Sequence, residues 1–247
     1  MSVGYGSTGA GATGSTSLSV AYPASIAAGD LLVLGVVSKY PTNGPTTPSG
    51  WTLAAQAQGG SGSAGLNAGD VYVTAYTREA DGTEAGSLAV TLTGCNSAAG
   101  AISRYTKTAG YAWSVAATSG TDTSAGTGWS VTGAADPGIA AGDMVVAVTG
   151  ANGDAASASG QSVTTTGVTY GGTTERTDTR GTIGDKCIFN VCTADATSGA
   201  SSAAPAFAAT FAASGANYPC GATVLVRLRE DPPAGTDPLG RGGFFGL

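Results

Sequence analysis

Histidine is absent from this chain of 247 residues. It is the usual general base of serine and cysteine hydrolases, so the commonest form of nucleophilic catalysis lacks its proton acceptor. Glycine runs are never followed by Lys-Ser or Lys-Thr, which excludes a phosphate-binding loop. Aspartates are nowhere dense enough to gather the several oxygens that calcium needs. The sequence therefore predicts a protein that is not an enzyme, with no catalytic residues, no cofactor and no metal site.

Charge is also scarce, because only 11% of the residues are charged and the ten lysines and arginines are scattered singly. A nucleic-acid partner needs clustered cations to displace phosphate counterions, so we expect no direct contact with nucleic acid. The start, Met-Ser-Val-Gly, lacks the basic and apolar parts of a secretory signal. Apolar runs stay far below the ~18 residues of a membrane span. We therefore expect a cytoplasmic product with no membrane partner.

The four cysteines include no Cys-x-x-Cys pair of the kind that holds zinc. In a reducing cytoplasm we expect Cys95, Cys187, Cys192 and Cys220 to be free thiols, often buried. A disulfide between Cys220 and either Cys187 or Cys192, formed after release from the cell, is the alternative that the sequence leaves open.

What the chain has in quantity is glycine, 41 residues, together with alanine, serine and threonine. Glycine costs a helix about 1 kcal/mol relative to alanine, whereas small residues suit sheets joined by many turns. Residues 70–80 alternate: Tyr72, Thr74, Tyr76 and Arg78 share one face. Residues 30–38 are almost continuously apolar, as in a central strand covered on both faces. These patterns predict an all-β fold with more than about 35% strand and less than about 10% helix.

One segment recurs. Ile26-Ala-Ala-Gly-Asp30-Leu-Leu-Val is repeated as Ile139-Ala-Ala-Gly-Asp143-Met-Val-Val, and two weaker landmarks follow in the same order, offset by roughly 113 to 121 residues. We therefore predict two tandem β-sandwich, jelly-roll-like domains related by internal duplication, with residues 31–37 and 144–148 as equivalent central strands. The expected boundaries are residues 1–110 for the first sandwich, 111–126 for a linker, 127–230 for the second sandwich and 231–247 for an extended arm. Two lobes of one continuous sandwich remain the alternative.

Two groups of carboxylates are candidates for catalytic or binding sites. Glycosidases use paired carboxylates, and Glu79, Asp81 and Glu84 lie close in sequence, but their segment has the composition of a polar hairpin connection. The other group follows glycine at strand starts, where an aspartate side chain caps local backbone N–H groups; it comprises Asp30, Asp70, Asp143 and Asp185. We expect turn chemistry from both groups.

Aromatic residues are few, and exposed ones could stack against sugars. The candidates for such a platform are Tyr40, Trp51, Trp113 and Trp129. Trp51 and Trp129 border strand-like segments, so we expect both of them in the core.

The last 17 residues have a different composition, rich in proline and glycine, which block helix and central strand. The arm nevertheless ends in an apolar cluster that is costly to leave in water, at about 1.5–3 kcal/mol per large side chain. We expect this arm to bind a partner subunit through Leu239, Arg241, Phe244, Phe245 and Leu247. Folding back onto its own domain and simple disorder are the alternatives.

Four landmarks together resemble a known group of proteins: Ala28-Gly-Asp-Leu-Leu-Val-Leu34 after Pro23, Pro48-Ser-Gly-Trp-Thr52, Tyr76-Thr-Arg-Glu-Ala-Asp-Gly-Thr-Glu84, and Tyr105. They are similar to minor structural proteins encoded among the head and tail genes of tailed phages and prophages. The resemblance covers about residues 14–108, with an echo over 127–230, and carries no catalytic residues.

The resemblance implies a β-sandwich component of the virion, made in the host bacterial cytoplasm: a capsid decoration, head fibre or tail/neck accessory protein. Its partners would be other virion proteins, of the capsid or of the tail and neck, and copies of itself as a homo-oligomer. A carbohydrate-binding or adhesive module that contacts a host surface glycan is the main alternative. A depolymerase is a further one, and it would require paired carboxylates in a deep cleft.

Overall fold

The computed structural model describes residues 2–39, 44–59, 71–122, 128–152, 158–181, 187–211 and 221–233. Within these ranges the chain forms sixteen strands and no helix, so the all-β prediction is confirmed. Strand pairings are antiparallel throughout the sheets. Since the described residues hold no helix, none of them belongs to a helix suited to crossing a membrane.

The strands divide between the two halves of the chain. The first half contains β1 (Gly4–Thr8), β2 (Ala12–Gly14), β3 (Ser17–Ala21), β4 (Leu31–Lys39), β5 (Thr52–Gly59), β6 (Val71–Glu79), β7 (Ser87–Thr91) and β8 (Ser97–Thr106). The second half contains β9 (Ala112–Asp122), β10 (Gly128–Thr132), β11 (Met144–Asn152), β12 (Ala158–Thr164), β13 (Val168–Gly181), β14 (Cys187–Gly199), β15 (Ala206–Phe211) and β16 (Gly221–Asp231).

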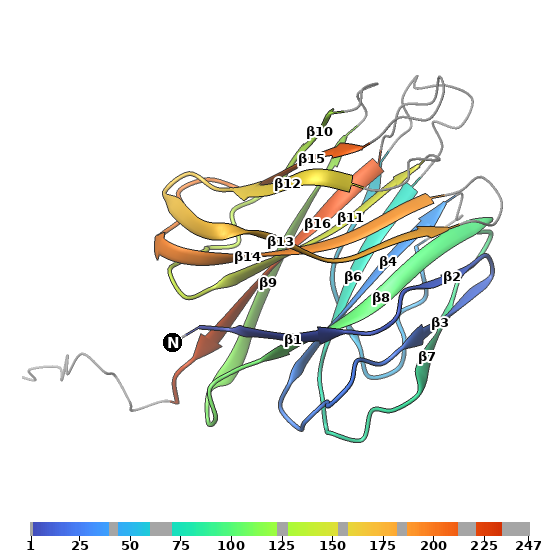
Figure 1. The fold of residues 1–247 in the computed structure, drawn as a ribbon, viewed down its shortest axis with the longest axis horizontal. Helices are drawn as coiled ribbons and strands as arrows, with labels where there is room; N and C mark the ends of the chain where they lie inside the picture. The colour runs from blue at the N-terminus through green and yellow to red at the C-terminus, as the bar shows by residue number, and fades with distance from the viewer. Residues whose placement is uncertain are drawn as a thin grey trace, which may run out of the picture.

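Each half supplies one large inner sheet and one small outer sheet. Inner sheet 1 has the order β1-β8-β4-β6-β5, with β2 also pairing with β8, and outer sheet 1 is β3-β7. Inner sheet 2 has the order β13-β14-β11-β16-β9, and outer sheet 2 is β10-β15-β12. In Figure 1 the two inner sheets lie between β10, β12 and β15 on one side and β3 and β7 on the other. The molecule is therefore a stack of four β layers.

A central core fills the space between the two inner sheets. It combines residues of β4, β6 and β8, such as Val33 and Val73, with residues of β11, β14 and β16, such as Val146, Phe189 and Val224. The two halves thus bury apolar faces of their inner sheets against each other. Two smaller cores lie between each inner sheet and its own outer sheet.

This layering explains the apolar run that marks β4. Successive side chains of a strand point to opposite faces, and both faces of inner sheet 1 are covered. Leu31 and Val33 face the central core, whereas Leu32 and Leu34 face outer sheet 1. Polar residues would be buried on either face, so alternation disappears from the sequence.

The open edges of the two inner sheets meet each other. At one side β1 lies against β13, where the Arg176 guanidinium carbon lies 3.8 Å from the centre of the Tyr5 ring. At the other side β5 lies against β9, and the Ser119 hydroxyl donates to the Gln56 carbonyl oxygen at 3.2 Å. Edge strands otherwise expose unpaired backbone groups, so these contacts protect both edges of the central sandwich.

The inner sheets have corresponding strand orders. Counting from the repeated Ala-Ala-Gly-Asp segment, β4 corresponds to β11, and each is the middle strand of its sheet. The other corresponding pairs are β1 and β9, β8 and β16, β6 and β14, and β5 and β13, and each pair holds the same place in its sheet. A β1 residue contacts β13 and β5 contacts β9, so each edge strand of one sheet meets the opposite edge strand of the other in the corresponding order.

Two glycines allow the inner sheets to approach at that centre. A Cβ added to Gly35 would lie 2.8 Å from Val148 Cγ1 and 3.0 Å from the Phe189 ring. A Cβ added to Gly150 would overlap Val37 and would lie 2.7 Å from Val73 Cγ2. Real Cβ atoms do not approach neighbours this closely, so a side chain at either position would push the sheets apart.

The segment 111–126, which the sequence analysis assigns to a linker, requires a correction. Most of it is β9, which pairs with β16 along its whole length, from Ala112 opposite Asp231 to Asp122 opposite Gly221. The strand was missed because its sequence is polar and small. It forms because β16 offers a complete ladder of backbone partners, and because one face of an edge strand can remain in solvent.

Candidate functional site

The repeated Ala-Ala-Gly-Asp segment forms the same turn in both halves. Asp30 Oδ2 accepts a hydrogen bond from the Ala27 N–H at 2.9 Å, and Asp143 Oδ2 accepts one from the Ala140 N–H at 2.8 Å. The glycine before each aspartate has a positive φ, 89° and 91°, which only glycine adopts readily. The capping prediction is thus confirmed for Asp30 and Asp143. Asp70 and Asp185 lie outside the described residues.

Each of these aspartates also binds an arginine on the neighbouring strand. Arg104 Nη1 on β8 lies 3.1 Å from Asp30 Oδ2. Arg229 on β16 makes two bonds to Asp143, from Nε to Oδ1 at 2.8 Å and from Nη2 to Oδ2 at 2.7 Å. The bond to Asp143 raises the pKa of Arg229, as charge-assisted pairing does. Both carboxylates therefore fasten a strand start to its neighbour, and sequence spacing gave no sign of these arginines.

The carboxylates of the β6–β7 connection are engaged in a similar way. Asp81 Oδ1 accepts hydrogen bonds from the N–H and the hydroxyl of Thr83, which lower the pKa of Asp81. Glu84 accepts bonds from two backbone N–H groups of the turn and pairs with Arg78 Nη2 at 3.0 Å. Glu79 Oε1 lies 2.6 Å from Lys107 Nζ. These contacts make the segment a self-capped surface turn, as expected.

The tryptophans do not form a common sugar platform. Trp51 is 6% exposed and packs in the core beneath outer sheet 1, while Trp129 is 2% exposed and packs in the core beneath outer sheet 2. The core prediction for both is confirmed. Trp113 packs against the central core, and its Nε1 donates to the Gly29 carbonyl oxygen at 2.9 Å. Tyr40 lies outside the described residues.

The three described cysteines are free and buried, each in a different core. Burial raises the pKa of the Cys187 thiol to about 11 and that of Cys192 to about 12, and it also raises the pKa of Cys95. Thiols held in the neutral form are poor nucleophiles, which fits a packing role. Cys220 lies outside the described residues, so the free thiol expected there, and the disulfide that is its alternative, stay untested.

The expected partner-binding residues also lie outside the described residues. They are Leu239, Arg241, Phe244, Phe245 and Leu247, and the described chain ends at residue 233. Their role therefore stays a prediction from the sequence.

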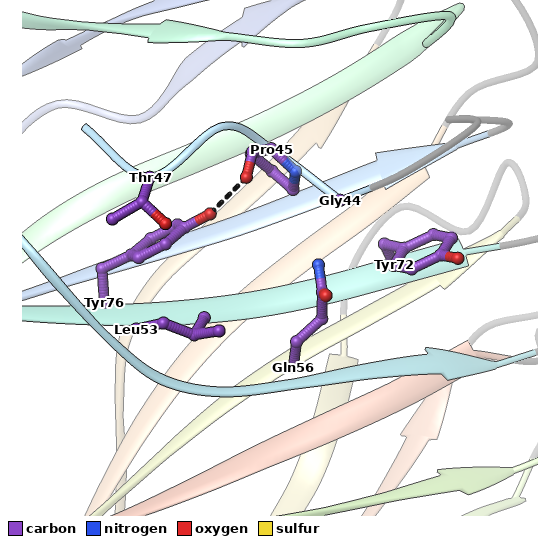
Figure 2. A pocket seen from close by; sticks show the side chains of 7 residues that line it. All are labelled: Gly44, Pro45, Thr47, Leu53, Gln56, Tyr72 and Tyr76. Atoms are coloured by element: carbon purple, nitrogen blue, oxygen red, sulfur yellow. Dashed lines mark hydrogen bonds between the residues drawn. The ribbon is translucent and has the colours of Figure 1, made fainter.

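The structure adds a pocket that the sequence analysis did not name. It lies on the outer face of inner sheet 1, has a volume of about 290 Å³ and is lined by Gly44, Pro45, Thr47, Leu53, Gln56, Tyr72 and Tyr76. Figure 2 shows the side chains of β5 and β6 in a row beneath the segment 44–47, which crosses above them. All seven lining residues are uncharged.

Hydrogen bonds hold the crossing segment in place. The Tyr76 hydroxyl donates to the Pro45 carbonyl oxygen at 2.6 Å and also bonds the Thr47 side chain, while burial raises the pKa of Tyr76. Gln56 Nε2 donates to Thr74 Oγ1 at 2.9 Å. Gly44 lies directly on the Gln56 amide, where a Cβ would overlap it. The pocket is therefore preformed.

Part of this pocket had a sequence signal. The alternation within β6 places Tyr72 and Tyr76 on one face, and both line the pocket. The segment 44–47 had no such signal, because its position over the sheet depends on contacts made after folding.

No family model, no curated protein and no solved structure matches this chain. In the part of the chain that the structure describes, no three histidine, cysteine, aspartate or glutamate side chains are grouped so that they could hold a metal ion. The functional proposal therefore rests on the residues of this chain and on the contacts that they make.

Proposed function

We propose that this protein is a non-enzymatic structural component of a tailed-phage virion, as a capsid decoration, head fibre or tail/neck accessory protein, and that it acts through protein–protein contacts. The observation that carries the proposal is the role of the residues behind the phage resemblance. Asp30 caps a turn, Trp51 and Tyr105 are buried, and Arg78 pairs with Glu84. Those landmarks build the fold, so the resemblance concerns architecture rather than chemistry.

Duplication of one jelly-roll-like sandwich is the second part of the proposal. The corresponding strand orders support it, and so does the backbone bonding of the repeated turn. The Gly29 N–H donates to the Ala80 carbonyl oxygen at 2.8 Å, and the Gly142 N–H donates to that of Ala196 at the same distance. The two copies pack as a fused pair with approximate twofold symmetry, the commonest arrangement of two like subunits. In that arrangement one chain supplies a rigid body with little charge.

The C-terminal arm completes the proposal. Its proline-rich start lowers the entropy that is lost on ordering, and its apolar end supplies the anchor for a partner subunit, either another copy or a coat or tail protein. The experiment is to delete residues 238–247 in the phage or prophage that encodes the chain and to purify particles on a density gradient. A variant with the same length, in which Leu239, Phe244, Phe245 and Leu247 become serine, is the matched control for arm length.

We expect the full-length protein in purified particles by mass spectrometry and at a defined site by electron microscopy. Both variants should keep the melting temperature of the purified protein and fail to join the particle. Normal incorporation of both variants would rule out docking by the arm. Absence of the full-length protein from particles would contradict the virion proposal itself.

A further inference from the structure

The pocket of Figure 2 occupies the place where the two halves differ most in their outer layers. In the second half, β12 pairs with β15 over residues 158–164 and lies next to β13. In the first half, the described part of the corresponding segment, from residue 44 on, bonds to β7 through the Thr46 N–H, which donates to the Thr91 carbonyl oxygen at 3.2 Å. Pro45 and Pro48 flank that residue and cannot donate to a ladder. Two prolines therefore replace a third outer strand with an open segment.

Local departure from an otherwise regular plan is a mark of functional sites. The departure here leaves a hollow floored by β5 and β6, at the lower limit of the 300–1,000 Å³ typical of ligand pockets. A hollow of this size suits one small ring rather than a long chain. We propose that this pocket binds an uncharged sugar residue of a glycan.

The polar groups of the pocket match sugar hydroxyls. An amide side chain has two donor hydrogens and an acceptor oxygen, and Thr74 takes one donor of Gln56. The other donor and Oε1 are suited to hydroxyl groups, which both donate and accept. The Tyr76 hydroxyl is already engaged by Pro45 and Thr47, so the polar contacts to a ligand fall to the Gln56 amide.

The apolar groups match the C–H face of a sugar ring. Leu53 lines the pocket with 47% of its surface exposed, and in the described residues only Val115 is a comparably exposed large apolar side chain. Tyr72, which is partly buried, adds aromatic surface to the lining, whereas Tyr76 is 1% exposed and belongs to the buried floor. Aromatic rings with a polar end suit ligands that are apolar on one face and hydroxylated on their edge.

The absence of charge from the lining selects among sugars. A carboxylate or phosphate moved from water into this pocket would meet no cation among the lining residues. An unpaired charge is costly to desolvate, whereas neutral hydroxyls exchange water bonds for amide and hydroxyl bonds. The pocket therefore favours a neutral hexose over its uronic acid.

The test uses the purified full-length chain and saturation-transfer NMR with matched pairs: glucose with glucuronic acid, and galactose with galacturonic acid. We expect at least one neutral member to bind in the millimolar range, with its acidic counterpart weaker by about tenfold. Gln56→Ala and Gly44→Ala should each weaken the neutral sugar by about tenfold, the first by removing hydrogen bonds and the second by displacing the amide.

The matched control is Gln161→Ala. Gln161 lines the groove of about 430 Å³ between β12 and β13 in the second half, and its loss should leave sugar binding unchanged. Melting temperatures within a few degrees of the parent protein establish that each variant is folded. No binding of either neutral sugar at about 20 mM, well above the millimolar range, would overturn the proposal. Equal binding of the acidic sugars, or binding unaffected by both pocket variants, would overturn it as well.

Discussion

In β4 the fifth and seventh residues after Asp30 are Gly35 and Val37, whereas in β11 the fifth and seventh residues after Asp143 are Val148 and Gly150. These corresponding positions meet across the central core: Gly35 packs against Val148, and Gly150 packs against Val37. A glycine therefore faces a valine in both places, in opposite orientations.

With glycine and valine placed in opposite order, the central face of inner sheet 1 fits inner sheet 2 but would not fit a second copy of inner sheet 1. Two copies of the first half in the same arrangement would place glycine against glycine and valine against valine. The first contact leaves a void, and the second overpacks, and both defects cost stability in a close-packed core. Two sheets of corresponding topology can therefore be made complementary by glycine–valine contacts at two positions.

Gly150→Val tests this complementarity most severely. The new side chain would overlap Val37 and press on Val73, so we expect the free energy of unfolding to fall by about 3 kcal/mol. Urea denaturation followed by circular dichroism measures the loss. Adding Val37→Gly should return part of it, with a coupling free energy above about 1 kcal/mol.

The control for that rescue is Val33→Gly combined with Gly150→Val. Val33 lies on the same strand and in the same central core, but it is not among the nearest neighbours of Gly150. We expect the two losses to add. Equal coupling for Val33 and Val37 would mean that the pairing has no local complementarity.

The two Asp–Arg pairs provide a second comparison. Asp143 makes two bonds to Arg229, whereas Asp30 makes a single bond to Arg104 in the first half. We expect Asp143→Asn to lower the free energy of unfolding by about 2 kcal/mol and Asp30→Asn by about 1 kcal/mol, because hydrogen bonds to charged groups contribute about 1.5–3 kcal/mol. Asp195→Asn, at an exposed position of β14, should leave stability unchanged. A larger loss from Asp30→Asn would contradict the ranking.

One buried cysteine of the second half takes the place of an apolar residue of the first half. Cys187 on β14 corresponds to Val71 on β6, since each lies opposite the last residue of its central strand. Burial raises the pKa of Cys187 from 9.0 to about 11. The thiol therefore ionises in the unfolded chain first, and its contribution to stability is present below pH 9 and is lost as the pH rises toward 11.

Cys187→Val should remove this contribution by giving the second half the residue of the first. At pH 10 the parent protein should have lost about 1 kcal/mol more than the variant, relative to pH 8, because one pKa unit corresponds to 1.36 kcal/mol. Parallel stability curves for the two proteins between pH 8 and pH 11 would contradict the assignment.

The smallest expected effect concerns Leu53, whose counterpart in the second half is Glu175. Leu53 on β5 lies opposite Tyr76 on β6, and Glu175 on β13 lies opposite Cys192 on β14. Tyr76 and Cys192 hold the same position in their corresponding strands. Leu53→Glu exchanges an exposed side chain, so the free energy of unfolding should change by less than about 0.5 kcal/mol. Sugar binding should nevertheless be lost, since the variant places a carboxylate beside the proposed ligand. A stability loss of several kcal/mol would show instead that Leu53 belongs to the core.

Sequence reasoning succeeded where the signal was local. The continuous apolar run of β4, the alternation of β6 and the Gly-Asp turns depend on neighbouring residues, and each was predictable. The pairing of Asp30 with Arg104 joins residues 74 positions apart, and no local pattern marks it. The stacking of the two inner sheets was missed for the same reason, because the sequence shows which residues are buried but not which sheet covers them.

The pocket was only half predictable. Period-two alternation placed Tyr72 and Tyr76 on one face of β6, but it did not show what lies above that face. The cover depends on where Pro45 interrupts the outer layer, which is a property of the folded chain. β9 failed differently, since its composition resembles a linker and pairing with β16 overrides that composition.

The shared central core sets an order of events on the ribosome. Inner sheet 1 has all its strands once Thr106 has emerged, yet the face that carries Val33 and Val73 is covered by strands that end as late as Asp231. At 5–20 residues per second, that apolar face waits for its cover on the order of ten seconds. Neighbouring ribosomes on one message present the same uncovered face during this interval. If inner sheet 1 paired with inner sheet 1 of a neighbouring chain, Gly35 would meet Gly35 and Val37 would meet Val37. These poor contacts favour pairing with inner sheet 2 of the same chain, although that sheet is made later.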